Sequence, residues 1–161
     1  MKKYKIIIIL LNLVILLFLF NKSVLDKEET LANGKLVLLK LAPVDPRSLM
    51  QGDFMRLRYD ISQNRKADSI SKRGYCVVKL NDKSIAKKVR YQDKLNPKNE
   101  GEYCIRYNAT QWNINIGAES YFFQEGEGEK YENAEYGGLM IDDNGKSILV
   151  GLYDENQKKI E

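Results

Sequence analysis

The residues best suited to chemistry gather between positions 42 and 59, where carboxylates, an arginine and a serine follow one another closely. Pro43 and Pro46 bracket Asp45 and hold the chain there in an extended conformation. Such a cluster at the mouth of a strand would suit a small polar ligand or a partner loop. The same residues also fit a rigid elbow that feeds the strand. The candidate binding residues are Asp45, Arg47, Ser48, Gly52, Asp53 and Glu125.

Two hydrolytic chemistries can be drawn from these side chains. A serine–lysine peptidase would use Ser48 as its nucleophile and a buried lysine as its base. A glycosidase would use Asp53 and Glu125 as its carboxylate pair. However, Ser48 lies in no Ser-Met-x-Pro sequence, and any chain with 22 acidic residues offers carboxylate pairs. We therefore expect a non-enzymatic module with no catalytic residues, and keep a hydrolase that uses Ser48 or the Asp53/Glu125 pair as the alternative.

The composition excludes several kinds of metal and cofactor site. The chain has no histidine, which rules out His-based triads, His-bound zinc and His-ligated haem. Its two cysteines are too few for a Cys₄ cluster, and their spacing is not that of a CxxC motif. The acidic segments at 125–129 and 142–145 do not fit the twelve-residue calcium loop. We expect no metal and no cofactor.

An apolar run at Ile6–Phe20, interrupted only by Asn12, marks the N-terminus. It would make a helix of about 22 Å, and flanking residues up to Leu25 extend it towards the ~30 Å of a bilayer core. No small-x-small cleavage site follows closely, which favours an uncleaved signal anchor over a cleaved signal peptide. Three lysines precede the run and one follows it, which predicts a cytoplasmic N-terminus.

These observations predict a single-pass protein of the cytoplasmic membrane. Residues 1–25 would form the cytoplasmic tip and the transmembrane anchor, residues 26–34 a linker, and residues 35–161 an extracytoplasmic or periplasmic domain. Of the 26 basic residues, four flank the anchor, so the remainder balances the 22 acidic residues. A neutral domain has no general field that attracts nucleic acid. The expected partners therefore include the lipid bilayer and exclude nucleic acid.

An extracytoplasmic location would permit a disulfide between Cys76 and Cys104. Strand alternation argues against it, because Cys76 shares an inward face with Val78 and Cys104 shares an outward face with Arg106. A bulge would reconcile the two faces. The sequence leaves this possible disulfide open.

Short alternating runs dominate the chain after residue 34. Residues 53–61 alternate between apolar and charged side chains, and turn signals at 81–83 and 142–145 indicate hairpins. One short polar helix is expected at 126–135. Roughly eight or nine short strands indicate a mainly β fold, a small antiparallel barrel or sandwich with one short helix, preceded by the transmembrane helix.

The octet at 52–59 reads GDFMRLRY and resembles the signature of the GDYxxLxY family, with Phe54 in place of the name-giving tyrosine. The segments 43–49, 121–128 and 145–152 are similar to the family too, so the resemblance covers residues 35–153. We read Leu57 and Tyr59 as core residues. The motif residues are Gly52, Asp53, Phe54, Leu57 and Tyr59.

The resemblance implies a membrane-anchored bacterial protein of a family whose function is uncharacterised. Members often occur beside polytopic membrane proteins of equally obscure role. A polytopic membrane protein or an envelope component is therefore the expected partner, and the resemblance brings no catalytic residues with it. The expected function is that of a membrane-anchored extracytoplasmic binding or accessory module.

Overall fold

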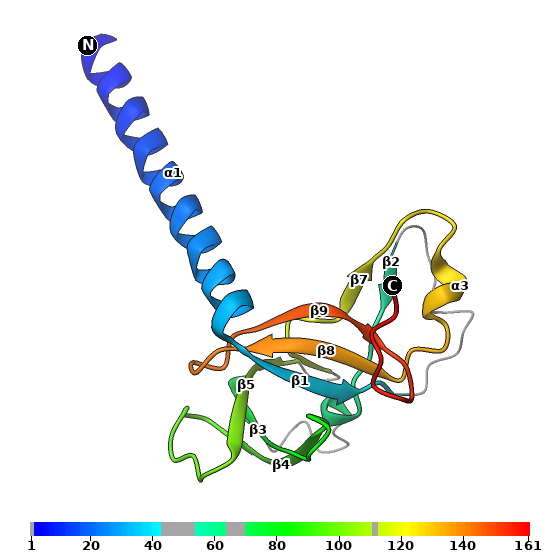
Figure 1. Ribbon diagram of the computed structural model, residues 1–161. Helices are drawn as coiled ribbons and strands as arrows, with labels where there is room; N and C mark the ends of the chain where they lie inside the picture. Colours follow the sequence, from blue (N-terminus) through cyan, green and yellow to red (C-terminus); the bar gives the residue numbers. More distant parts are fainter. Residues whose placement is uncertain (1, 43–53, 64–69, 111–112) are drawn as a thin grey trace.

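A computed structural model describes residues 2–42, 54–63, 70–110 and 113–161. A long N-terminal helix stands at one end of a β domain (Figure 1). The helices are α1 (Lys2–Asn33), η1 (Asp60–Ser62, a 3₁₀ turn) and α3 (Gly128–Tyr131). The strands are β1 (Lys35–Lys40), β2 (Phe54–Arg56), β3 (Arg73–Leu80), β4 (Ala86–Gln92), β5 (Glu102–Ala109), β6 (Ile114–Asn115), β7 (Ser120–Phe122), β8 (Tyr136–Ile141) and β9 (Ser147–Tyr153).

The described strands form three antiparallel sheets, in the orders β1-β8-β9, β2-β7 and β4-β3-β5-β6. Single backbone hydrogen bonds link the larger sheets at their margins. Leu38 N–H donates to the Ser84 carbonyl at 2.8 Å, and Arg106 N–H donates to the Gly145 carbonyl at 2.8 Å. The prediction of a mainly β antiparallel domain behind an N-terminal helix is confirmed, and the described strands do not close into a barrel.

One hydrophobic core joins the sheets. Alternation along the strands turns apolar side chains inward, as expected for sheets with one face on the core. The core receives residues from the first sheet, the third sheet and the octet segment. Its fully buried members include Val37, Leu39, Leu139, Cys76, Val78, Ile105 and Tyr59.

The alternation predicted for residues 53–61 is confirmed in the described residues 54–61, but most of the segment is not strand. Met55, Leu57 and Tyr59 are buried, while the arginines between them are exposed. Strand β2 ends at Arg56, Tyr59 makes a single bridge with Leu41, and η1 follows. Every second side chain therefore remains buried beyond the point where the regular strand hydrogen bonding of β2 ends.

The polar segment 26–34, expected as a linker, continues helix α1 to Asn33. Gly34 N–H donates to the Thr30 carbonyl at 3.0 Å, and Thr30 is 3% exposed. The Asp26 carboxylate pairs with the Lys146 ammonium at 2.9 Å. These contacts hold the helix end against the β8–β9 turn. The segment is a helical stalk that is joined to the β domain.

Helix α1 is long and apolar enough to cross a membrane from Tyr4 onward. None of its most apolar stretch is buried against the rest of the described chain. Figure 1 shows the helix leaving the β domain as a lone rod. Such a surface is stable in hydrocarbon and unstable in water.

Candidate functional site

The structure describes one of the six candidate binding residues. Asp45, Arg47, Ser48, Gly52 and Asp53 lie outside the described residues. Glu125 is exposed in the turn after β7, in which Glu127 N–H donates to the Gln124 carbonyl at 3.1 Å. Glu125 lines neither of the clefts described below. The Asp53/Glu125 pair therefore stays a prediction.

A cleft of about 650 Å³, the octet cleft, lies beside the second half of the octet. Its charged residues are Arg56, Arg58 and Glu119. Its apolar and aromatic residues are Leu57, Tyr59 and Ile114. Its neutral polar residues are Ser62, Gln63, Asn113, Asn115 and Ser120. Because Leu57, Tyr59 and Ile114 are almost fully buried, the accessible wall of the cleft is mainly polar.

Tyr59 is a core residue that lies directly beneath the lining of the cleft. Its ring is fully buried, and its hydroxyl donates to the Ala118 carbonyl at 2.6 Å. A Cβ on Gly137 would lie 2.8 Å from Tyr59 Cε1, so the ring packs directly on the backbone of β8. Burial, reinforced by nearby Glu119, raises the pKa of the Tyr59 hydroxyl. The phenol therefore stays protonated and acts as a structural donor, which confirms Tyr59 as a core residue.

The two cleft arginines sit on backbone that is held from both sides. Arg56 faces Ser120 in the β2–β7 pairing, and the Arg58 carbonyl accepts from Ala42 N–H at 2.8 Å. Leu57, between them, is 3% exposed and donates its N–H to the Glu119 carbonyl at 2.8 Å. The structure thereby confirms Leu57 as a core residue and presents both guanidinium groups on the exposed side.

The Glu119 carboxylate is engaged by its own loop. Ile116 N–H donates to Oε1 at 2.5 Å, and Gly117 N–H donates to Oε2 at 3.1 Å. Gly117 has φ +83°, which glycine adopts without strain. The carboxylate thus closes the 116–119 turn. Among the described lining residues, hydrogen-bond donors and positive charge predominate.

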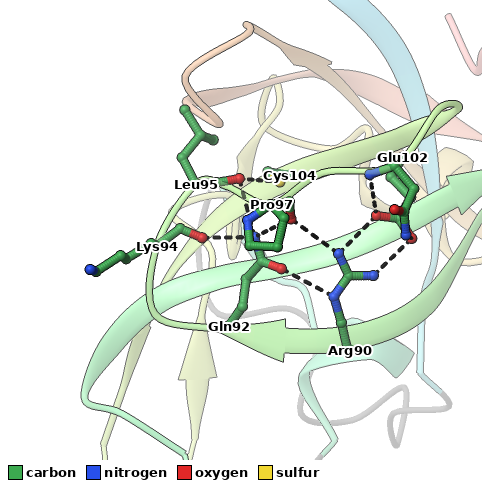
Figure 2. Close-up of polar contacts among 8 residues, drawn as sticks. Arg90, Gln92, Lys94, Leu95, Pro97, Glu102 and Cys104 are labelled. Carbon is green, nitrogen blue, oxygen red and sulfur yellow. Dashed lines mark hydrogen bonds and ion pairs between the residues drawn. The ribbon is translucent and has the colours of Figure 1, made fainter.

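A second polar cluster, centred on Arg90 and Glu102, holds the 94–101 loop (Figure 2). The guanidinium binds the carboxylate through two parallel hydrogen bonds of 2.7 and 2.8 Å. Asn99 adds its backbone N–H to Glu102 at 3.0 Å. The Gln92 amide donates to three loop carbonyls, those of Lys94, Leu95 and Pro97. The polar side-chain groups of Arg90, Gln92 and Glu102 all bond within the cluster, so the cluster is structural.

The Glu102 pKa reflects these contacts. Hydrogen bonding from Arg90, and then from the Asn99 backbone, lowers it to about 2. Arg90 lies on β4 and Glu102 on β5, with β3 between them. The ion pair therefore could not be predicted from the spacing of the two residues in the sequence.

The two cysteines carry free thiols, so the possible disulfide is not formed. Cys76 faces Ile105 and Cys104 faces Val77 in the β3–β5 register. The cysteines are thus one position out of register and point to opposite faces, as alternation predicts. Burial raises the pKa of the Cys76 thiol to about 12, which makes it unreactive at neutral pH.

A smaller cleft of about 340 Å³ lies where the stalk meets the domain. It is bounded by the end of α1, the β8–β9 turn and the start of β5, and Asp26 and Lys146 pair across it. Over residues 2–42, 54–63, 70–110 and 113–161, no three His, Cys, Asp or Glu side chains come close enough to hold a metal ion.

Fold and cleft together define a class of protein: a small open β domain, with a donor-rich cleft, carried on a long apolar helix. The chain belongs to the GDYXXLXY protein family, which matches residues 16–152. The match begins inside α1 and ends in β9, so it includes the stalk and the octet. Comparison with curated proteins and with solved structures finds no match.

Proposed function

We propose that this protein is a membrane-anchored binding or accessory module that partners an integral membrane protein or an envelope component. In this proposal α1 crosses the cytoplasmic membrane with its N-terminus inside, and the β domain works on the extracytoplasmic side. The observation that carries the proposal is the unbroken connection between an exposed apolar helix and the β domain.

The dimensions of α1 support a membrane-spanning role. The segment from Tyr4 to Leu25 would measure about 33 Å as a helix, which matches a ~30 Å hydrocarbon core. Lys5 and Lys22 lie near the two ends of this segment, where long basic side chains reach the membrane surface, and the first acidic residue is Asp26. The excess of lysines before the apolar run supports an N-terminus in the cytoplasm.

Asn12 supports a partner within the membrane. It is exposed on α1, in the middle of the apolar segment. A polar amide in hydrocarbon gains from a hydrogen bond to a neighbouring helix, by about 0.6–2 kcal/mol. Asn21 differs, because its amide already donates to the Leu17 carbonyl of the same helix at 2.8 Å. The pair offers a comparison, because Asn12 lies in the middle of the apolar segment, whereas Asn21 lies at its end and already uses one amide N–H within its own helix.

The test is photo-crosslinking of the full-length protein in its native membrane, with the photoreactive residue at Leu16 on the face of Asn12. We expect one discrete adduct with an integral membrane protein. Asn12→Leu should lower its yield roughly 3- to 30-fold, following the free energy of an interhelical hydrogen bond. Asn21→Leu is the matched control and should leave the yield unchanged. A lack of any adduct, or equal yields from both variants, would contradict the proposal.

A further inference from the structure

Two arginines of the octet lie on the same side of the octet cleft. Arg56 and Arg58 are two residues apart, both are exposed and both line the cleft. In extended chain their Cα atoms are about 6–7 Å apart. The three ion pairs among the described residues join other partners: Arg90–Glu102, Lys130–Glu127 and Lys146–Asp26. Two neighbouring positive charges attract an anion placed between them.

The rest of the cleft fits a small ligand better than a bare ion. Its volume of about 650 Å³ falls in the range of small-molecule sites. The amide side chains of Gln63, Asn113 and Asn115 supply uncharged donors on its rim. Tyr59 is fully buried and held by its hydrogen bond to the Ala118 carbonyl, and it fixes the backbone next to Arg58.

Glu119, the described acidic residue of the lining, forms no ion pair with Arg56 or Arg58 among the described contacts. Both oxygens of Glu119 accept backbone N–H groups from Ile116 and Gly117. These bonds orient the carboxylate towards its own turn. The cleft therefore keeps an excess of donors, and its preferred ligand is an acceptor with several oxygens.

We infer that the octet cleft binds a phosphate group, either as free phosphate or as a phosphomonoester of a small molecule. A carboxylate has two oxygens, which one guanidinium satisfies through its fork of donors. A phosphomonoester has three free oxygens and a charge of about −1.5 to −2 at neutral pH, which suits two guanidinium groups. This inference does not depend on the proposed membrane partner.

Calorimetric titration of the full-length protein in dodecyl maltoside tests it, since that detergent carries no phosphate. The probes are inorganic phosphate, glucose 6-phosphate and, as the carboxylate comparison, acetate. We expect saturable binding of at least one phosphate probe and weaker binding of acetate. The two phosphate probes separate the sources: binding of glucose 6-phosphate alone identifies a monoester site, and equal binding identifies recognition of phosphate itself.

The double variant Arg56→Gln/Arg58→Gln should weaken binding of the phosphate probe at least tenfold. The matched control is Lys79→Gln/Lys87→Gln, which removes the same charge from an exposed cross-strand pair outside the cleft. It should leave the affinity within twofold.

Arg56→Lys/Arg58→Lys keeps the charge, loses the planar fork of donors and should give an intermediate affinity. It also preserves the test if the glutamine variant unfolds. The inference is overturned if no phosphate probe binds, if acetate binds more tightly, or if both glutamine variants lose affinity equally.

Discussion

Glu102 is the described carboxylate most firmly held by its neighbours. Each of its oxygens accepts from Arg90, at 2.7 and 2.8 Å, and Asn99 donates both its backbone and its amide nitrogen to the same group. These contacts favour the ionised form and place the pKa at about 2, below the ordinary value of 4.5. A carboxyl group whose pKa is lower in the folded state stabilises the fold wherever it is ionised.

Glu102→Gln should therefore lower the melting temperature at neutral pH, because the Arg90 guanidinium keeps only part of its partner. The lowered pKa of Glu102 determines how the stability difference between the two proteins changes with pH. The advantage of the natural protein over the variant is complete above pH 4.5 and disappears as the pH falls towards 2. Thermal melts of both proteins between pH 2 and 7 measure this difference. Glu100→Gln, an exposed change in the same loop, is the control and should show no such convergence.

Among the elements, β8 is the central strand of its sheet and contains two consecutive glycines. It lies between β1 and β9 and carries Gly137 and Gly138 in succession. The Tyr59 ring packs on Gly137 and the Tyr153 ring packs on Gly138. Glycine weakens an isolated strand, but here it lets a ring approach the backbone closely. Tyr59, the last residue of the octet, thus requires a residue without a side chain at position 137 of β8.

Gly137→Ala should destabilise the protein by about 1–3 kcal/mol, the usual cost of overpacking a core. The added Cβ would lie 2.8 Å from Tyr59 Cε1, and Tyr59 is fully buried and fixed by its hydroxyl. Urea unfolding followed by circular dichroism gives the free energy. Gly138→Ala is the comparison and should cost less, because Tyr153 is only half-buried and its ring is able to turn away. A Gly137→Ala protein as stable as the natural one would show that Tyr59 moves.

At the scale of the whole molecule, the two natural thiols are buried, which makes the topology easy to measure. Asn156 is exposed near the C-terminus. In intact cells, Asn156→Cys should react with a membrane-impermeant maleimide if the β domain is extracytoplasmic, as proposed. The natural protein is the control and should remain unlabelled. Labelling of Asn156→Cys only after the cells are opened would place the domain in the cytoplasm and contradict the proposed orientation.

Much of the architecture could be predicted because it depends on local patterns. The alternation around Met55 and Leu57 predicts which side chains are buried, and the apolar run predicts α1. The helical stalk could not be predicted in this way, since its polar residues are held by the distant Lys146. The Arg90–Glu102 pair and the octet cleft likewise depend on segments far apart in the sequence. Long-range contacts of this kind produce no regular residue spacing in the sequence from which they could be predicted.

The continuous stalk has a consequence for how lipids act on this protein. If α1 spans the bilayer as proposed, its continuation to Asn33 and the Asp26–Lys146 ion pair couple the tilt of the helix to the orientation of the β domain. Transmembrane helices adjust their tilt to the thickness of the surrounding bilayer, around an average of about 20°. A change of tilt then reorients the opening of the octet cleft relative to the membrane plane. Bilayer thickness would thus set the direction from which a ligand has to approach.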